Sequence, residues 1–270
     1  MSIAGNIASL NTGSIRFRRL RVGIVVLGVL ALVSFDAASI YDAWRSYRHS
    51  IVATDREIGN LAASLAEQTS WTWQGVDLLL DDTARWYRND GQHIPPERLD
   101  EVLTTRTAAV RQVSLVTIVD AEGIQRYRSR GTSPPNLSVS DRSYFIAQRD
   151  HAATGFFMSE PLVTRSENRT AVVVSRRLDD DNGDFAGVIT AIVDLDDLKQ
   201  FYTAVNVGMG SAIHLLRDDG TLLVRNPATP EAVAHKFPAL AAPTSAPTTR
   251  LVNPIDGTEN FIAVDRKSVV

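Results

Sequence analysis

An apolar run near the N-terminus, Val22 to Ile40, restricts what this chain can fold into more than any other feature. Its 19 residues are mostly Val, Leu, Ile and Ala, and Asp36 is its only charge. As a helix the run would span about 28 Å, which is close to the thickness of the hydrocarbon core of a bilayer. The run therefore predicts one membrane-spanning helix.

Arginines precede this run, and small residues lie near its end. Because positive charges near a membrane helix tend to stay in the cytoplasm, the preceding arginines predict a cytoplasmic N-terminus and an extracytoplasmic bulk. These arginines are Arg16, Arg18, Arg19 and Arg21. A cleaved signal peptide is the alternative, since a basic segment, an apolar core and the small residues Ala37-Ala38-Ser39 fit one as well. We favour the anchor because the apolar run is long for a signal peptide.

A proline-free helical pattern continues from Ala37 to Tyr87. Large residues recur on it at intervals of seven: Trp44, Ile51, Ile58, Leu65, Thr72, Leu79 and Trp86. Such a stripe is typical of a coiled-coil seam or of a packed bundle face. We expect a dimer seam near the membrane and intramolecular packing from about Leu65 onward. The alternative is that the whole stripe only covers the protein's own sheet.

The composition excludes several classes of function. The chain has no cysteine, which rules out disulfides, thiol catalysis and cysteine metal sites, and its net charge of −3 argues against nucleic acid as a partner. Its five histidines show no metal-ligand spacing, and no Ser-His-Asp, paired-carboxylate or glycine-rich phosphate signature occurs. We therefore predict no enzyme activity, no cofactor and no metal. The acidic segment Asp179 to Asp184 could suggest calcium, but it lacks the pattern of an EF-hand loop and favours a solvated hairpin.

The stretch from Asp141 to Leu198 carries the clearest order of elements. Asp141 is a natural N-cap for a short helix that begins with Arg142-Ser143-Tyr144-Phe145. After Ser159-Glu160-Pro161, two runs rich in β-branched residues, Thr170 to Arg176 and Phe185 to Val193, are separated by a turn that contains Asn182-Gly183. This dipeptide is a strong hairpin signal. The second run ends in Asp194, before a short amphipathic helix.

This order resembles the ligand-sensing half of the double Cache family, the PAS-like extracytoplasmic sensors of bacterial membrane receptors. The resemblance implies an α+β protein that binds a small molecule outside the cell and catalyses nothing. Together with the apolar run and the seven-residue stripe, it predicts a single-pass protein of the bacterial inner membrane, with its bulk in the periplasm and a homodimer formed through the long helix after the membrane. Relatives continue into a second transmembrane helix and a histidine kinase, diguanylate cyclase or chemotaxis output domain, before which this chain is expected to be truncated.

A second strand–turn–strand unit suggests a second domain. Ala212 to Leu216 and Thr221 to Arg225 repeat the unit formed by Ser114 to Val119 and Ile124 to Ser129, with turn glycines at 123 and 220, a domain-sized offset of 220 − 123 = 97 residues. We expect a transmembrane helix that continues into a stalk helix, then two PAS-like antiparallel-sheet domains, the second incomplete. The expected segments are 1–21 cytoplasmic, 22–40 transmembrane, 41–88 stalk, 89–205 membrane-distal ligand-binding domain and 206–270 partial membrane-proximal domain.

The resemblance also implies site residues. In the amino-acid-binding branch of the family the pocket carries an R-x-W-Y pattern and a late acidic residue. Arg142, Tyr144 and Phe145 match the first with both aromatics exchanged, and Asp194 stands at the acidic position, while Leu162 replaces a further tyrosine. Arg142 would bind a carboxylate bidentately, and Asp194 and Tyr144 would bind an ammonium or hydroxyl group. Phe157, Ser159 and Ser175 are weaker lining candidates.

Two of these residues have structural alternatives. Asp194 could only cap the helix that begins at Leu195, and Arg142 could be a solvated residue of a first turn. The predicted ligand is a small polar metabolite, a carboxylate or an amine-bearing compound. The rival hypothesis is a truncated receptor fragment that acts only as a dimerising or interaction protein without signalling output.

Overall fold

The computed structural model describes residues 7–131, 136–205, 207–208, 210–242 and 248–265, with no side-chain description at 7–22, 50–52, 97 and 261. The predicted cytoplasmic residues before Ile7 and the chain end after Asp265 lie outside these ranges. The chain forms two compact units, residues 1–57 and 58–270. A single helix, α1 (Ile7–Asn89), makes up the described part of the first unit and continues into the second.

The first unit exposes its apolar side chains. In the helix from Gly23 onward, an 18-residue window has a mean hydropathy of 2.2, and none of that window is buried. Ile24, Leu27 and Phe35 are each more than half exposed. By length and composition this helix can cross a membrane, which is the property that the apolar run predicted.

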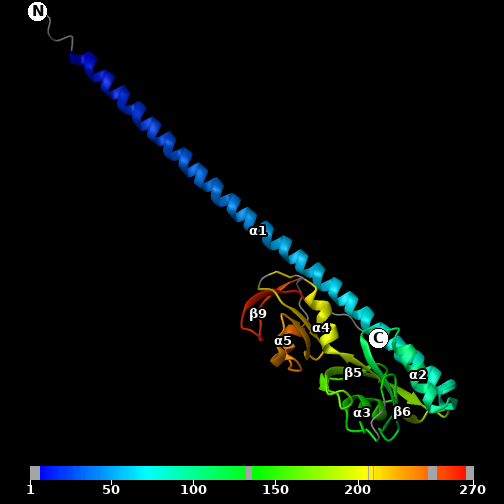
Figure 1. Ribbon diagram of the computed structural model, residues 1–270. Helices are drawn as coiled ribbons and strands as arrows, with labels where there is room; N and C mark the ends of the chain where they lie inside the picture. The colour runs from blue at the N-terminus through cyan, green and yellow to red at the C-terminus, as the bar shows by residue number, and fades with distance from the viewer. Residues whose placement is uncertain (1–6, 132–135, 206, 209, 243–247, 266–270) are drawn as a thin grey trace, which may run out of the picture. The chain divides into compact units, whose positions relative to one another are not determined.

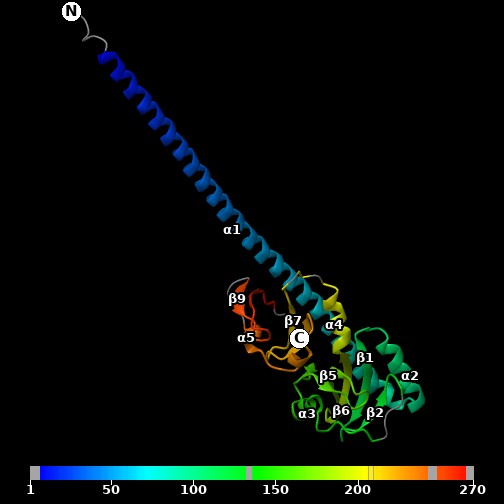
Figure 2. The same cartoon turned by 60° about the vertical axis from the view of Figure 1, so that its left-hand side comes forward.

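The second unit is built on a six-stranded antiparallel sheet (Figures 1 and 2). Its strand order is β2-β1-β6-β5-β3, and β4 also pairs with β5. The strands are β1 (Val113–Asp120), β2 (Gln125–Arg128), β3 (Phe157–Met158), β4 (Leu162–Val163), β5 (Thr170–Asp179) and β6 (Phe185–Asp194). The predicted hairpin between the two β-branched runs is confirmed as β5 and β6, which pair from Ala171–Asp194 to Asp179–Phe185.

Alternating side chains give this sheet two apolar faces. One face packs on the last turns of α1, on α2 (Pro96–Thr107) and on α4 (Leu195–Thr203), a short 3₁₀ turn, Gly91–His93, joining α1 to α2. The other face packs on α3 (Ser143–Asp150) (Figure 2). Leu65, Leu79 and Trp86 of α1 contact the first core, so the predicted intramolecular packing from about Leu65 onward is confirmed.

Gly187 allows the close approach of β6 to β1. Its φ is +140°, and a Cβ there would lie 2.1 Å from the Val119 carbonyl oxygen. Only glycine fits both the backbone conformation and this space. The hairpin turn before β6 is closed by Asp180, whose carboxylate accepts hydrogen bonds from the Asn182 and Asp184 amides, both at 2.9 Å.

The remaining strands form two separate two-stranded sheets, β7–β8 and β9–β10, within the described ranges. They are β7 (Ile213–Leu216), β8 (Leu222–Asn226), β9 (Thr249–Val252) and β10 (Glu259–Ile262), with a 3₁₀ turn (Pro230–Ala232) and α5 (Pro238–Ala241) between the pairs. The sequence predicted β7 and β8, but a single sheet for this domain is not seen in the described ranges. The free edge of β8 is instead bonded by the following segment: Leu222 donates to the His235 carbonyl and Ala234 donates back to the Leu222 carbonyl.

Candidate ligand-binding site

A cavity lies on the α3 face of the six-stranded sheet. The space that no protein atom fills is about 400 Å³, with the open solvent at its mouth counted. Its lining residues come from β1, β2, β4, β5, β6, the start of α3 and two loops: Thr117, Val119, Gln125, Leu137, Val139, Arg142, Tyr144, Leu162, Thr164, Arg165, Ser166, Val173, Thr190 and Ile192. Ligand sites commonly occur in such concave spaces with a few convergent polar groups.

The charge of the lining is one-sided. It contains Arg142 and Arg165 and, among the residues that the structure describes there, no carboxylate. Arg165 is held by Asp141 through two contacts of 2.8 Å and donates to the Ser138 carbonyl at 2.7 Å. Among the residues that the structure describes, Arg142 makes one long contact, of 3.4 Å, to the Val163 carbonyl. The less engaged guanidinium is therefore that of Arg142.

The prediction that Asp141 caps α3 is wrong. The N-cap position is occupied by Arg142 in an extended conformation, and no side chain caps the helix. The Asp141 carboxylate turns instead to Arg165, 24 residues later, and this hydrogen-bonded pair lowers the pKa of Asp141. A bidentate ion pair with arginine offers the carboxylate two charge-assisted bonds, which a helix cap does not.

Tyr144 supplies a neutral hydroxyl. Its side chain is buried, and burial raises the pKa of Tyr144 to about 12, because the buried site disfavours the phenolate. The group therefore remains protonated at physiological pH and can donate or accept a hydrogen bond. The helix that carries it is fixed to the sheet, since the Ser175 hydroxyl donates to the Tyr144 carbonyl at 2.9 Å.

The floor of the cavity is formed by β1 and β6. The hydroxyls of Thr117 and Thr190 lie 2.7 Å apart across these strands, and both side chains are buried. Val119 and Ile192 lie next to them on the same face by the two-residue alternation of strands. A ligand here would meet two hydroxyls within an otherwise apolar surface.

Asp194 is not among the lining residues. One of its oxygens accepts a hydrogen bond from the Asp196 amide at 2.8 Å and so caps α4, and the other is ion-paired with Arg169. The capping role, one of the two alternatives from the sequence, is therefore present. The ligand-binding role of Asp194 stays a prediction.

The other candidate residues also lie outside the lining. Phe145 is buried and packs edge-on against Phe185, with ring centroids 5.6 Å apart. Phe157 on β3 pairs with Ser175 on β5. Ser159 accepts a hydrogen bond from the Val173 amide at 3.0 Å, so its hydroxyl holds the β3–β4 connection to the sheet. Their assignment to a ligand remains untested.

Several lining residues were not predicted from the sequence. Thr117 and Thr190 lie inside β-branched runs, where threonine is expected for its propensity alone. Their alternation with Val119 and Ile192 was the available signal. Arg165 lies in a loop without a pattern, and only the pair with Asp141 reveals its place.

Comparisons with known proteins assign the fold to a family. A family model described as a histidine kinase sensor domain, of the dCache_1-like type, matches residues 195–269. The extracellular domain of rpHK1S-Z16, which is described as a histidine kinase, is 31% identical with a TM-score of 0.69 over 79% of this chain and 89% of that one. Among curated proteins, no significant match is found.

Two further structures share the fold at lower identity. The ligand-binding domain of the Pseudomonas fluorescens chemoreceptor CtaA, in complex with L-serine, is 18% identical, with a TM-score of 0.59 over 77% of this chain and 88% of that one. That of the Pseudomonas aeruginosa PAO1 amino-acid chemoreceptor PctC, in complex with GABA, is 18% identical, with a TM-score of 0.58 over 77% and 96%. The chain therefore belongs to the double Cache family of extracellular sensor domains, the ligand-binding parts of signal-transduction receptors such as histidine kinases and chemoreceptors.

Proposed function

We propose that the cavity on the α3 face binds a small carboxylate-bearing metabolite and that this binding is the signal the receptor senses. The observation that carries the proposal is the one-sided charge of the lining: Arg142 and Arg165 face a space to which the described residues contribute no carboxylate. A buried or half-buried guanidinium is stabilised by an anionic partner, and a carboxylate matches its fork geometry.

Arg142 is the residue we assign to the carboxylate. Its long contact to the Val163 carbonyl leaves most of its donors available to a ligand, whereas Arg165 is already engaged by Asp141. Tyr144 lies two residues further along the chain. Its neutral hydroxyl would form a second hydrogen bond with the ligand, as donor or as acceptor. The Thr117–Thr190 pair would meet the other end of the ligand.

Whether the ligand also carries an amine group is a separate question. The CtaA and PctC domains are in complex with L-serine and GABA, which favours ligands that carry both groups. In this chain Asp194 is occupied by Arg169 and by the α4 cap. A ligand ammonium would reach Asp194 only by displacing Arg169, so the cavity as it stands offers hydroxyls to the second end of a ligand.

Binding to the full chain in lipid nanodiscs tests the proposal. Organic acids, amino acids and polyamines are screened by thermal shift, since a ligand that binds only the folded state raises the melting temperature. A hit among carboxylates is expected. Calorimetry should then show that Arg142→Ala weakens binding by about 1.5–3 kcal/mol, the range for a hydrogen bond to a charged group.

Arg149→Ala is the matched control for this experiment. Arg149 lies on the same helix but is exposed and paired with its neighbour Asp150. Its loss should leave affinity unchanged. Equal binding by wild type and Arg142→Ala, or a response to polyamines alone, would contradict the proposed site.

We further propose the membrane arrangement and assembly. Residues 22–40 cross the inner membrane once, residues 1–21 stay in the cytoplasm, and a PAS-like domain, 89–205, and a partial one, 206–270, lie in the periplasm. The exposed apolar helix of the first unit supports the crossing. The seven-residue stripe upstream of Leu65, in which Trp44 is half exposed, supports a homodimer through the stalk 41–88.

A further inference from the structure

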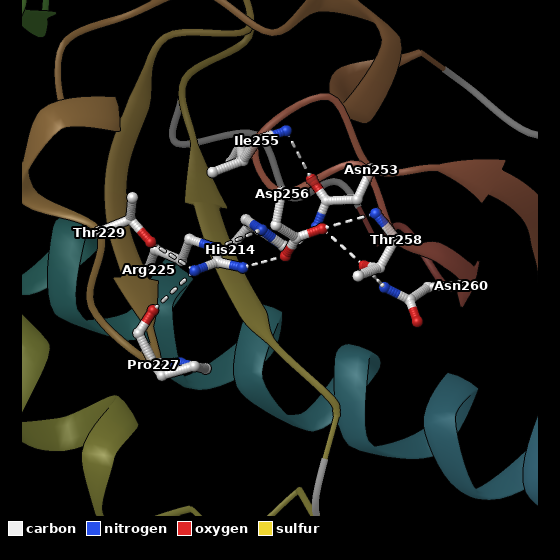
Figure 3. Close-up of polar contacts among 9 residues, drawn as sticks. All are labelled: His214, Arg225, Pro227, Thr229, Asn253, Ile255, Asp256, Thr258 and Asn260. Carbon is white, nitrogen blue, oxygen red and sulfur yellow. Dashed lines mark hydrogen bonds and ion pairs between the residues drawn. The ribbon is translucent and has the colours of Figure 1, made fainter.

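A buried arginine joins the two small sheets of residues 206–265. Arg225 on β8 is 8% exposed, and its guanidinium donates to the His214 Nε2 atom at 3.2 Å, to the Pro227 carbonyl at 3.1 Å and to the Thr229 hydroxyl at 2.5 Å (Figure 3). Its remaining nitrogen pairs with Asp256, which lies in the turn between β9 and β10. Every side of the guanidinium is thus engaged by a different segment.

Asp256 in turn organises the β9–β10 turn. Its carboxylate accepts hydrogen bonds from the Thr258 amide at 3.0 Å and from the Asn253 side chain at 3.3 Å (Figure 3). Asn253 is almost fully buried and its side-chain oxygen accepts from the Ile255 amide. The carboxylate therefore connects the turn to Arg225 and holds the turn's own loop at once.

The β9–β10 hairpin depends on this connection. In the described ranges β9 and β10 pair only with each other, and no ladder joins them to β7 or β8. An isolated two-stranded hairpin is at best marginally stable in water. The Arg225–Asp256 ion pair ties the hairpin to β8.

His214 takes part only in its neutral form. Because Nε2 accepts a hydrogen bond from the Arg225 Nε–H, the proton of the neutral ring must lie on Nδ1. Protonation of the ring would remove this acceptor and place two cations in contact. Burial, and then the charge of Arg225, lower the pKa of His214 to about 4, while Asp256 acts in the opposite direction.

Arg225 and Asp256 are the charged groups that act on the imidazole from β8 and from the β9–β10 turn. An arginine guanidinium in general keeps its charge at physiological pH. The hydrogen bonds from Thr258 lower the pKa of Asp256, so its carboxylate remains ionised at mildly acidic pH. Of these three groups, His214 alone changes charge between neutral pH and about pH 4.

We propose that His214, Arg225 and Asp256 form an acid-sensitive latch, in which protonation of His214 repels the Arg225 guanidinium, weakens its ion pair with Asp256 and so releases the β9–β10 hairpin from β7–β8. The sensor would thereby respond to acidification independently of the ligand in the α3-side cavity. When the latch opens, the ring regains water and its ordinary basicity, so the released state binds more protons. The stability of the latched state relative to the released state is therefore highest above about pH 6.5. It decreases as the pH falls from about 6.5 to about 4 and is constant below that.

Hydrogen–deuterium exchange of the full chain in nanodiscs tests the latch. Peptides that cover residues 249–262 are followed at pH 7.5 and pH 5, with rates corrected for intrinsic exchange. With a latched pKa of about 4 and a released pKa of about 6.5, protection of the hairpin should fall by up to about 30-fold at pH 5. Protection of β5 and β6 should stay constant.

Two variants separate the latch from general acid effects. His214→Gln can keep an acceptor for Arg225 without the imidazole charge, so its hairpin should stay protected at pH 5. His235→Gln removes an exposed histidine of the same segment and should behave as wild type. A wild-type hairpin that is equally protected at both pH values would overturn the proposal, as would a pH response that persists in His214→Gln.

A second measurement does not depend on any variant folding. In the full chain labelled with ¹³C-histidine, one of the five imidazole signals should titrate below pH 5. If all of them titrate above pH 6, His214 is not held in its neutral form and there is no latch.

Discussion

The hydroxyl of Thr69 on α1 lies 2.6 Å from the hydroxyl of Tyr202 on α4. Tyr202 is almost fully buried, and its carbonyl accepts a hydrogen bond from the Asn226 side chain on β8 at 2.9 Å. One residue in the last turn of α4 thus bonds to α1 through its side chain and to the β7–β8 hairpin through its carbonyl. A movement of α4 must therefore strain contacts with both neighbours.

Tyr202→Phe should lower the free energy of unfolding by about 1 kcal/mol, because the variant loses one buried hydrogen bond and leaves Thr69 with a poorer partner. Urea unfolding followed by circular dichroism measures the change. Tyr47→Phe, at an exposed position of α1, is the control and should have no effect. Equal stability of wild type and Tyr202→Phe would mean that water replaces the contact without cost.

Gly187→Ala should destabilise the fold by about 3 kcal/mol, since it adds a clash with the Val119 carbonyl to an unfavourable φ. Gly155→Ala provides the comparison: Gly155 also has a positive φ, +61°, but a Cβ there meets nothing within 4 Å. It should lose only about 1–2 kcal/mol. Thermal unfolding of both variants separates the steric part from the conformational part, and similar losses would argue against the close approach of β6 to β1.

Substitutions of Asp194 distinguish its role as the α4 cap from its predicted role in ligand binding. Asp194→Ala should cost about 1 kcal/mol of stability through loss of the α4 cap. Asp194→Ser keeps a capping oxygen but loses the charge that faces Arg169, so it should retain most of that stability. If the ligand carries an amine and displaces Arg169, Asp194→Ser should weaken its binding, and titration calorimetry shows this. Unchanged affinity would leave Asp194 as a helix cap alone.

The topology predicts the behaviour of reporter fusions. A reporter that is active only in the periplasm should be active when it is fused to the C-terminus of the chain and silent when it is fused after Arg21. The arginines before the apolar run give the reason. A stable but silent C-terminal fusion would disprove the orientation.

The stalk stripe predicts a dimer contact. The double variant Trp44→Asp with Ile58→Asp places charges in an apolar seam. It should abolish cross-linking between copies in membranes. Ala53→Asp lies off the stripe and should cross-link as wild type does. Unchanged cross-linking of the double variant would show that the stripe serves only the protein's own fold.

The sequence predicted regular elements better than it predicted side-chain partners. The β5–β6 hairpin follows from two β-branched runs around Asn182-Gly183, a local signal that tertiary contacts reinforce. The cap at Asp141 was wrong because a distant arginine competes for the carboxylate. The separate pairing of β7–β8 and β9–β10 was not predicted. The segment after β8 forms hydrogen bonds with the free edge of β8, and no hydrophobic periodicity in the sequence indicates these bonds.

The candidate site divides in the same way. Arg142 and Tyr144 were predicted from the resemblance and do line the cavity, whereas Arg165 and the Thr117–Thr190 pair were found only in the structure. The four residues Phe145, Phe157, Ser159 and Ser175 lie on the predicted elements, but their side chains point into packing and hydrogen bonds of the fold. The sequence predicted which elements lie near the site, but not the direction in which each side chain points.

The fixed position of α3 has a consequence for ligand choice. Gln148 donates to the Ser175 carbonyl at 2.9 Å and the Ser175 hydroxyl donates to the Tyr144 carbonyl, so this wall of the cavity is locked from inside the core. The segment 162–166 forms another part of the lining: Leu162 and Val163 pair with β5, and the exposed Arg165 is held by Asp141. Diversification of relatives toward new ligands would meet least resistance at Arg165, whose exposed side chain lies outside the packed interior. Directed evolution for a changed specificity should begin there.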